Sequence, residues 1–548
     1  MSQIINYLSD IYMVCPVIVM KKSRDYSRYK KMYFKPEFGD CVACGHRLKR
    51  DHIAWRKHIQ TMKGKIFAFS YAYKCSSTAC GRTYRSAEAD LLSLPFRTYS
   101  LDVSAETGFL RHEEKRSIPE IDESLSRKRI DISERECYDL VHLFEELIAT
   151  RPIELDQDFL EKAGENGGIV LAIDGVQPER GNSTLYVLQD ALTSKVLYAD
   201  YLYNSSSENI AAIIGKVRDA LERLGIPIIA VISDHQVSIR LGVKRALPGV
   251  RHQFCHFHVL RNACLPVMDL DRNLKKKIRK RIRGIPKIER SLQGRDDPMA
   301  SQVRDACSLL RGLLIYPGTK PLTFSGMSVF QRLASIDGTI RRMLLAGNDS
   351  DLRKLSGITG RWREFIGDYR KVSDLAVYAN RLRETLASES SSDEVKRTLT
   401  AFLENIRRKI REGGIWSNLT AMADTIENHW DGLFFCYDDK RIPRTDNNLE
   451  ITIRHNKTSY RRMSGFRSWD SFIAQYGRST FLIPHASRNE LVEMEEKVSR
   501  EAFSDRWREF TSRKKCQALM RKASTGYNAA LKTIESRWRL SGGSAGTK

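Results

Sequence analysis

Two apolar segments of the chain each run into an aspartate, and this feature constrains the fold more than any other. Residues 168–176 read Gly-Ile-Val-Leu-Ala-Ile-Asp-Gly-Val, and residues 228–234 read Ile-Ile-Ala-Val-Ile-Ser-Asp. Their length and β-branched content predict two buried strands that place Asp174 and Asp234 at or near their ends. An ionised carboxylate at such a position is costly unless a cation or hydrogen bonds compensate it. The pattern therefore indicates a metal.

A third acid, Glu450, follows a polar stretch that predicts the start of a helix. Residues 445–449 read Thr-Asp-Asn-Asn-Leu, and their Asp and Asn side chains can cap a helix that begins close to Glu450. Helical spacing then places cations on or beside the stripe that contains Glu450. These cations are Arg454, Lys457, Arg461 and Arg462. An acid aligned with cations suits a metal ion next to a phosphate backbone.

We interpret Asp174, Asp234 and Glu450 as one catalytic site. Mg²⁺ and Mn²⁺ prefer oxygen ligands, and two such ions can stabilise both the attacking and the leaving oxygen of an in-line displacement. The three acids would hold this pair of ions. The alternative is that the aspartates are turn residues and Glu450 is an exposed helical acid. A different third ligand would be Asp446 or Glu427.

The segments around the first two acids predict an ordered series of strands and helices. Residues 184–193 and 195–203 are predicted strands, and residues 209–224 have the apolar spacing of an amphipathic helix. A helix over 237–247 and a short strand over 251–258 follow. This order, with the second acid after the fourth strand, resembles the ribonuclease-H-like core of DDE transposases and retroviral integrases. The resemblance implies a mixed sheet in a multidomain α/β protein.

Two blocks carry a more specific resemblance. Residues 233–262 run from Ser-Asp-His to Cys-His-Phe-His-Val-Leu-Arg-Asn. They are similar to the second-aspartate block of Mutator-like and related bacterial insertion-sequence transposases, with Cys255 and His258 as the Cys-x-x-His signature. Residues 430–450 look like the third-acid block of bacterial insertion-sequence transposases. One departure is that Glu450 comes sooner after the two asparagines than in many relatives.

The resemblance implies a function as well as a fold. A DDE transposase binds the ends of a mobile DNA element, cleaves phosphodiester bonds and joins the 3′ ends to target DNA. The implied partner is double-stranded DNA, bound by a homodimer or a higher oligomer. The alternative is a non-catalytic, sequence-specific DNA-binding protein, such as a domesticated transposase or a repressor, but three intact acids favour the enzyme. A nuclease with the same core is a third possibility.

The Cys255 and His258 pair supplies two of the four ligands that a structural zinc ion needs. His252, His256 and Cys264 lie nearby in the sequence and would complete a site only if the fold brought them together. We interpret the pair as structural, acting through packing and hydrogen bonds, because a buried cysteine usually behaves as a small apolar residue. Metal binding is the alternative.

The 216 positions from Asp234 to Glu450 are too many for a simple connection in a compact core. We therefore predict an all-helical insertion over residues 265–430. Its first helix includes a basic run over residues 272–283, which suits a polyanion or, alternatively, forms an ordinary solvated face. The candidate DNA-binding cations of this run are Lys275, Lys276, Lys277, Arg279 and Lys280.

Four cysteines near the start of the chain have the spacing of a metal site. They form a Cys-x2-Cys and a Cys-x4-Cys pair, with a glycine after each pair, and an alternating strand lies between them. The cysteines are Cys41, Cys44, Cys75 and Cys80. We predict one structural Zn²⁺ in a zinc ribbon. Rival ligands are His46, His52 and His58, and four unrelated buried cysteines are the other reading.

Residues 112–150 predict a helix-turn-helix. Ser117 with Glu120, and Ser133 with Glu136, can each form a capping box at the start of a helix. Such a pair of helices around a basic turn can place its second helix in the major groove. The candidate DNA contacts are Arg127, Lys128, Arg129 and Arg135. The acids of the second helix weaken this interpretation, and an ordinary helical hairpin is the alternative.

Composition agrees with a DNA-binding protein of several domains. The net charge of +24 indicates a polyanionic partner, and no apolar run reaches the length of a membrane span. The odd count of 11 cysteines indicates a reducing, intracellular location with DNA, in cytoplasm or nucleoid if the host is bacterial. The predicted domains are a zinc-ribbon domain (1–100), a helix-turn-helix domain (101–165), the first part of the core (166–264), the helical insertion (265–430), the second part of the core (431–490), and a basic helical region with a disordered tail (491–548).

Overall fold

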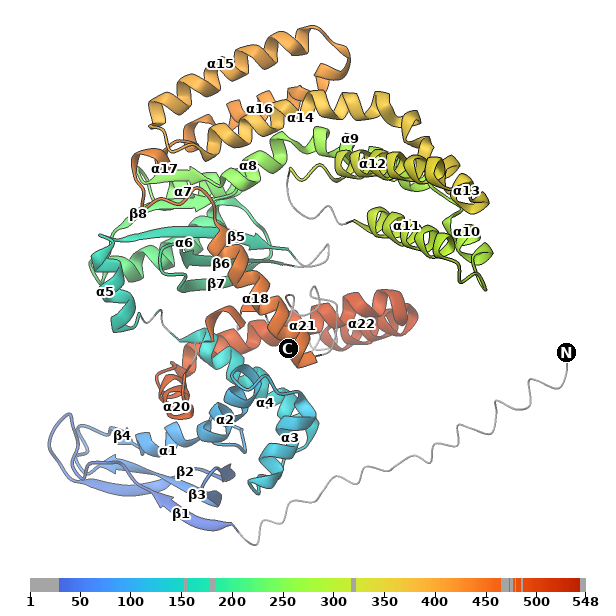
Figure 1. The fold of residues 1–548 in the computed structure, drawn as a ribbon. Coiled ribbons are helices and arrows are strands. Elements are labelled where there is room, and N and C mark those ends of the chain that lie inside the picture. Colours follow the sequence, from blue (N-terminus) through green and yellow to red (C-terminus); the bar gives the residue numbers. More distant parts are fainter. Residues whose placement is uncertain are drawn as a thin grey trace, which may run out of the picture. The chain divides into compact units, whose positions relative to one another are not determined.

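The computed structural model describes residues 29–151, 153, 155–177, 183–316, 322–464, 473, 477, 478, 480–483 and 486–542 (Figure 1). The chain forms two compact units, and each combines separate stretches of sequence. One comprises Met1–Pro152, Ser459–Arg467 and Ile483–Lys548, and the other comprises Ile153–Thr458 and Ser468–Leu482. The predicted mixed α/β class is confirmed, with a mixed sheet in each unit. The predicted disordered tail, residues 543–548, lies outside the described residues.

The unit that contains the acids has a five-stranded sheet in the order β7-β6-β5-β8-β9. β5, β6 and β7 are successive antiparallel neighbours, whereas β8 and β9 run parallel to β5. Helices α6 and α7 make the two parallel crossovers. The bounds are β5 (Ile169–Val176), β6 (Thr184–Asp190), β7 (Val196–Leu202), α6 (Ser207–Glu222), β8 (Ile228–Ser233), α7 (Val237–Ala246) and β9 (Arg251–Phe254).

Apolar residues on one face of this sheet pack against its helices. Ile169, Leu171 and Ile173 of β5 are fully buried in a cluster with side chains of α5 (Gln157–Glu165), α6 and α7. The chain enters β5 at Gly168, whose φ is +132° and whose missing side chain would meet the Pro227 carbonyl. A glycine is required there, because it lets β5 start directly beside the segment that leads into β8.

One predicted strand differs from the structure. Residues 251–258 were expected to be extended, but β9 ends at Phe254 and α8 (His256–Ala263) begins two residues later. The apolar and aromatic content of the segment favoured a strand. The short strand instead stops at the edge of the sheet, and the backbone amide of His256 donates to the Arg444 carbonyl at 2.8 Å. Cys255 and His258 therefore lie at the start of a helix.

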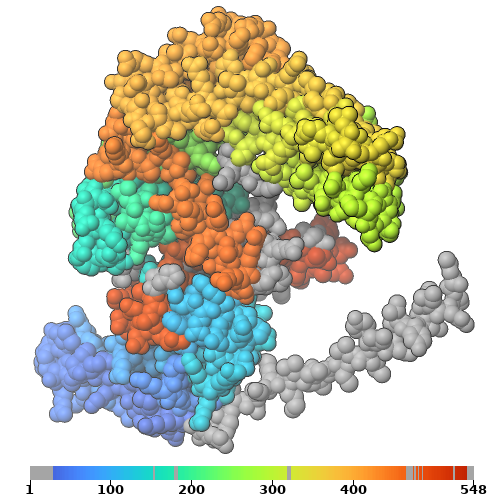
Figure 2. Space-filling model, in the orientation of Figure 1, coloured from blue at the N-terminus to red at the C-terminus, as the bar shows by residue number. Residues whose placement is uncertain are grey.

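The region from 265 to 430 contains helices and turns, with no strand among its described residues, 265–316 and 322–430. Two apolar clusters hold it together, one around α14 to α16 and one around α9 to α13. The yellow and light-orange helices form one continuous body in Figure 2. The bounds are α9 (Leu265–Arg281), α10 (Ile285–Ser291), α11 (Pro298–Ile315), α12 (Ser325–Ala346), α13 (Ser350–Thr359), α14 (Ile366–Ala387), α15 (Ser392–Arg411) and α16 (Thr420–Asn428).

The chain returns to the sheet after this region. A short helix, α17 (Phe435–Asp438), is followed by α18 (Asn447–Ser464), and the boundary between the two units falls within α18. Asn448 anchors the start of α18, because its Nδ2 donates to the Ala191 carbonyl at the β6–β7 turn, at 2.7 Å. The fold thus brings the third acid to the same sheet as the first two.

The other unit combines the N-terminal sheet with helices from both ends of the chain. Its sheet has the order β1-β3-β2, with β4 beside β3, and β1 runs parallel to β3. The C-terminal helices pack on the N-terminal ones, with α20 against α2 and α21 against α4. The bounds are β1 (Lys30–Phe34), β2 (Leu48–Thr61), β3 (Gly64–Cys75), β4 (Thr83–Tyr84), α1 (Ala87–Leu92), α2 (Leu101–His112), α3 (Ile118–Arg127), α4 (Glu134–Thr150), α20 (Arg488–Glu496), α21 (Arg500–Thr525) and α22 (Tyr527–Gly542).

No helix in the described part of the chain combines the length and the apolar character that crossing a membrane requires.

Candidate functional site

Asp174 lies near the carboxyl end of β5, and Asp234 directly follows β8, the parallel strand beside it. Ile173 of β5 is the register partner of Ser233 of β8, and each aspartate comes one residue later. Neighbouring strands are about 4.8 Å apart, so the two carboxylates start from adjacent backbone positions. Asp174 Oδ1 accepts a hydrogen bond from the Gly175 amide at 2.7 Å, and Asp234 Oδ1 accepts one from the Gln236 amide at 3.2 Å.

The carboxyl group of Asp174 lies in a strongly acidic environment. Burial raises its pKa to about 7, and the charges of Asp446, Asp234 and Glu450 act in the same direction. Three acids, from the end of β8 and the start of α18, therefore raise the pKa of one half-buried carboxyl group on β5. Such a cluster is unfavourable without cations, because like charges in a low-dielectric site repel one another.

Glu450 lies in the first turn of α18, and its amide donates to the Asp446 carbonyl at 3.2 Å. Asp446 is only 2% exposed and contributes more strongly than Glu450 to the electrostatics of Asp174. Glu427 instead pairs with Arg407 on the surface of the helical region. Of the two alternative third ligands, the structure therefore brings Asp446, and not Glu427, into the acidic cluster.

A cavity of about 500 Å³ opens beside the acids. It is polar, and it contains acids, imidazoles and one cation. Its lining residues are Asp174, Gly175, Asp234, His235, Gln236, His258, Arg261, Asn262 and His429. A guanidinium and amide groups next to carboxylates suit an anionic substrate that binds together with cations.

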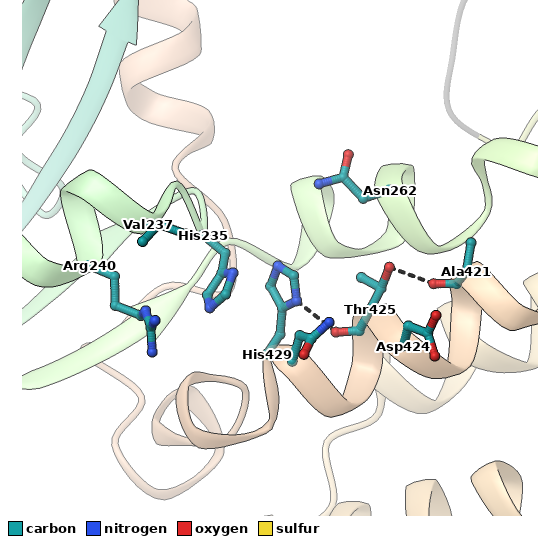
Figure 3. A pocket seen from close by; sticks show the side chains of 9 residues that line it. His235, Val237, Arg240, Asn262, Ala421, Asp424, Thr425 and His429 are labelled. Atoms are coloured by element: carbon teal, nitrogen blue, oxygen red, sulfur yellow. Dashed lines mark hydrogen bonds between the residues drawn. The ribbon is translucent and has the colours of Figure 1, made fainter. Parts of the chain in front are cut away.

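A second cavity of about 630 Å³ adjoins the first and is shown in Figure 3. His235, Asn262 and His429 line both cavities. The rings of His235 and His429 face one another with centroids 3.9 Å apart, and His429 Nδ1 lies 2.6 Å from the Thr425 carbonyl. Burial, reinforced by His429 and Arg240, lowers the pKa of His235 to about 4.

Sequence reasoning missed His235, His429 and Arg261 as residues of the site. His235 and Arg261 stand close in sequence to Asp234 and His258, so their proximity to the site was a usable signal. His429 comes from the end of the helical insertion, and nothing in its local sequence indicates that it meets His235. Gly432 helps to place this segment, because its Cα packs so closely on the Phe254 ring that a Cβ would lie 2.3 Å from it.

Cys255 and His258 lie together with Asp446, and their ligand atoms are all within 4.8 Å of one another. The residues that the sequence offered as further ligands have other roles. His252 hydrogen-bonds Ser233 Oγ at 2.8 Å, and His256 hydrogen-bonds the Leu433 carbonyl at 2.9 Å. Cys264 is buried but is not part of this group.

The four N-terminal cysteines form a cluster that can bind a metal such as zinc. The Sγ atoms of Cys41 and Cys80 are 3.6 Å apart, and those of Cys44 and Cys75 are 3.4 Å apart. Sulfurs about 2.3 Å from a tetrahedral zinc would be about 3.8 Å from one another. Residues 45 and 81 are glycines with φ of +72° and +59°, which turn the chain after each cysteine pair.

The surroundings of this cluster favour a thiolate at Cys41. The Tyr84 hydroxyl lies 3.3 Å from Cys41 Sγ, and this hydrogen bond lowers the pKa of Cys41 to about 6, whereas the hydrogen bond with Cys75 raises the pKa of Cys44 and burial raises that of Cys75. The rival histidines are not in the cluster. His46 bonds the Cys44 carbonyl through its ring, His52 pairs with Asp51, and His58 stacks on Phe67 with ring centroids 4.1 Å apart.

Both capping boxes of the predicted helix-turn-helix are present, at the starts of α3 and α4. Three of its four candidate DNA-binding cations form ion pairs within the same unit. Arg127 pairs with Glu123, Lys128 with Glu106, and Arg135 with Asp139 at 3.4 Å. All residues from 140 to 149 in α4 are buried, because α2, α20 and α21 pack on this helix. Charged, exposed residues therefore occur mainly in the first turn of α4. Because most of this helix is covered by other helices, the structure favours an ordinary helical hairpin over a DNA-recognition helix.

Some of the basic side chains of α9 have hydrogen-bond or ion-pair partners, and others have no ion pair with the described residues. Lys275 donates to the Tyr316 carbonyl, and Lys277 pairs with Asp368 at 2.6 Å. Lys276, Arg279 and Lys280 are exposed and form no ion pair with any described residue. On α18, the predicted cations likewise have no acidic partner among the described residues. These are Arg454 and Lys457 in the unit of the acids, and Arg461 and Arg462 in the other.

Comparison of the sequence with protein-family models and with curated proteins finds no match in either set. The chemistry of the site therefore has to be inferred from the residues themselves. They provide four clustered acids, a polar cavity with a guanidinium, and unpaired cations on the helix that contains the third acid.

Proposed function

We propose that this chain is a DDE transposase. It binds the ends of a mobile DNA element, cleaves phosphodiester bonds there and joins the 3′ ends to target DNA. The proposal rests on the placement of Asp174 and Asp234, each one residue after a register partner on two adjacent parallel strands. The charge of Glu450 also raises the pKa of Asp174.

The topology supports a ribonuclease-H-like core. Three antiparallel strands are followed by two parallel crossovers, and the second acid lies directly after β8. A long helical region separates this sheet from the helix that brings the third acid back. These are the features on which the resemblance to transposases and integrases was based.

The residues fit a pair of Mg²⁺ or Mn²⁺ ions. Burial and neighbouring acids raise the pKa of Asp174 to about 7, and bound cations would offset this accumulation of negative charge. Asp174, Asp234 and Glu450 would hold the ions through carboxylate oxygens, the ligands these metals prefer. Bound there, the ions would activate the attacking oxygen and stabilise the leaving oxygen of an in-line displacement.

The protein itself positions the DNA. Arg261 lies in the cavity of the acids, where its guanidinium can bind a phosphate next to the scissile bond. Arg454 and Lys457 continue along α18 from Glu450, and the exposed cations of α9 would bind further phosphates. No covalent enzyme intermediate is needed, because water or a DNA 3′-hydroxyl attacks the phosphorus directly.

The other unit would bind the element ends. The four-cysteine cluster and its strands support a zinc ribbon, and α3 and α4 add a basic turn that includes the exposed Arg129. Two copies of the chain, each bound to one end, would form the homodimer or larger assembly that paired ends require. Phosphate contacts supply the affinity, whereas contacts to base edges supply the sequence preference.

Strand transfer is the decisive test. The full chain is incubated with Mg²⁺, a supercoiled plasmid that carries the DNA flanking its gene, and a second plasmid as target. Breaks at fixed positions together with joints into the target are expected, and Asp174→Asn and Asp234→Asn should lose both products. Asp219→Asn, an exposed acid on α6, is the matched control. Breaks without joints would identify a nuclease, and tight binding without breaks would identify a non-catalytic DNA-binding protein.

A further inference from the structure

Cys255, His258 and Asp446 converge from two distant parts of the sequence. Cys255 Sγ lies 3.0 Å from Asp446 Oδ1, and His258 Nδ1 lies 3.8 Å from Asp446 Oδ2. A thiol, an imidazole and a carboxylate therefore surround one small volume, with all their ligand atoms within 4.8 Å of one another.

Local structure explains why these three side chains meet. Cys255 is the N-cap residue of α8, and His258 is the third residue of this helix. In a capping box, the side chains at these two positions lie close together. Asp446 directly precedes α18. The hydrogen bond from the His256 amide to the Arg444 carbonyl joins the two helix starts, so Asp446 is held next to the Cys-x-x-His pair.

Two buried polar atoms of this group have no hydrogen bond within the described residues. Asp446 is 2% exposed, yet its Oδ2 has no hydrogen-bond partner among the described residues, and the same is true of the buried Nδ1 atom of His258. The 3.8 Å between these two atoms is too long for a hydrogen bond. Buried polar atoms without partners are costly, and their most direct common partner here is a cation between them.

We propose that Cys255, His258 and Asp446 bind a zinc ion, separate from the four-cysteine cluster and from the Mg²⁺ ions. One sulfur, one nitrogen and one oxygen ligand suit Zn²⁺, whereas Mg²⁺ does not accept a thiolate. Zinc with three protein ligands keeps a fourth position for an oxygen atom. His258 also lines the cavity of Asp174 and Asp234, so water in that cavity can fill this position. The thiol proton of Cys255 is released to solvent when the ion binds.

The inference does not depend on transposase activity, because its test measures bound metal in the full chain. Mass-spectrometric metal analysis of wild-type protein saturated with Zn²⁺ and then desalted should give about two ions per chain. A background variant with Cys41→Ser and Cys44→Ser should keep about one ion. Adding Asp446→Asn or Cys255→Ser to this background should remove that ion, whereas adding Cys264→Ser, a buried thiol outside the group, should not.

Cobalt substitution identifies the ligands directly. Co²⁺ bound to the Cys41/Cys44 background variant should show a weak charge-transfer band from a thiolate ligand. This band should disappear in Cys255→Ser. It should also be lost in Asp446→Asn, and a band that persists there would mean that the aspartate is not a ligand. Circular dichroism confirms that each variant is folded. Should Cys255→Ser fail to fold, the near-isosteric Asp446→Asn decides the question. A background variant without metal, or with an ion that survives both substitutions, would overturn the proposal.

Discussion

Arg478 donates a hydrogen bond from Nη1 to Asp200 Oδ1 at 3.0 Å, although the two residues are 278 positions apart in the chain. Arg478 is completely buried, and its backbone amide donates to the Tyr201 hydroxyl at 3.4 Å. Asp200 also accepts a hydrogen bond from Tyr198. The outer strand β7 is thus tied to a segment that follows α18.

Removing the carboxylate of this pair should destabilise the unit that contains the acids. Asp200→Ala removes an anion that hydrogen-bonds the buried guanidinium of Arg478, and breaking a buried ion pair typically costs about 3–5 kcal/mol of unfolding free energy. Chemical denaturation followed by tryptophan fluorescence measures the change. Asp219→Ala, an exposed acid on α6, should change stability by less than about 0.5 kcal/mol. Equal effects of the two substitutions would mean that the buried pair contributes no net stability.

Stability without metal should fall as the pH rises towards neutrality. The ordinary pKa of an aspartate is about 3.8, whereas burial raises the pKa of Asp174 to about 7, so the folded state binds this proton more tightly than the unfolded state. A raised carboxyl pKa favours folding below about pH 4, and this advantage is lost between about pH 4 and 7. The contribution of Asp174 is on the order of 4 kcal/mol. Thermal unfolding in a chelator, measured from pH 5 to 8, should show the decline.

Asp174→Asn should flatten this pH profile and raise the melting temperature of the metal-free protein at pH 8, because it removes one buried negative charge. In the wild type, the stabilisation by Mg²⁺ should increase as the pH rises. The ion competes with the proton of Asp174, so it should stabilise the protein more at pH 8 than at pH 5.5. A variant that is less stable than the wild type at pH 8 would contradict the electrostatic account.

The sequence predicted those parts of the site that depend on local patterns. Residue periodicity and capping residues were enough to predict the two strands that place Asp174 and Asp234 at or near their ends, and the helix that starts close to Glu450. Asp446 was recognisable as an acid but not as the partner of Cys255, because that contact depends on how α8 and α18 begin relative to one another. His429 and Arg478 gave no local signal, since their partners lie far away in the sequence.

The grouping of the helices was also beyond sequence reasoning. The C-terminal region was expected to be a separate basic region, whereas α20 and α21 pack on α2 and α4 in the same compact unit. Leu491, Val498 and Phe503 are buried in apolar clusters with N-terminal helices. Their spacing predicts helices, but hydrophobic periodicity does not identify which face of another helix will cover them.

The four-cysteine cluster should control the order of the N-terminal sheet. Cys41→Ser removes one of four ligands, and the zinc of this cluster should be lost, since structural zinc sites supply much of the folding free energy of small modules. Hydrogen exchange should then increase in β2 to β4 and remain unchanged in the five-stranded sheet. Cys516→Ser, an exposed thiol outside the cluster, should retain the metal. An unchanged exchange pattern in Cys41→Ser would rule out a structural role for the ion.

The unpaired cations of α9 should contribute more to DNA binding than the paired ones. Lys276→Ala, Arg279→Ala and Lys280→Ala remove exposed charges that form no ion pair within the described part of the chain. Each lost phosphate contact should reduce the slope of log affinity against log salt by about one unit. Lys277→Ala, which breaks the pair with Asp368, should change the slope less. Fluorescence anisotropy at several salt concentrations measures these slopes, and identical slopes for all four variants would show that α9 is a solvated face.

Within α4, the first turn is exposed and can contact base edges. Arg135 is exposed and its pairing with Asp139 at 3.4 Å is loose, while residues 140–149 are covered by other helices. If this turn enters the major groove, Arg135→Ala should lower affinity for element ends by about 1–3 kcal/mol and leave binding to scrambled DNA nearly unchanged. Arg127→Ala, at the exposed end of α3, should weaken both kinds of DNA equally, because a phosphate contact carries no sequence information. Competition binding with end DNA and scrambled DNA separates the two effects. Equal loss on both DNAs in Arg135→Ala would exclude α4 as a recognition helix and leave the four-cysteine module or the core to supply the preference for element ends.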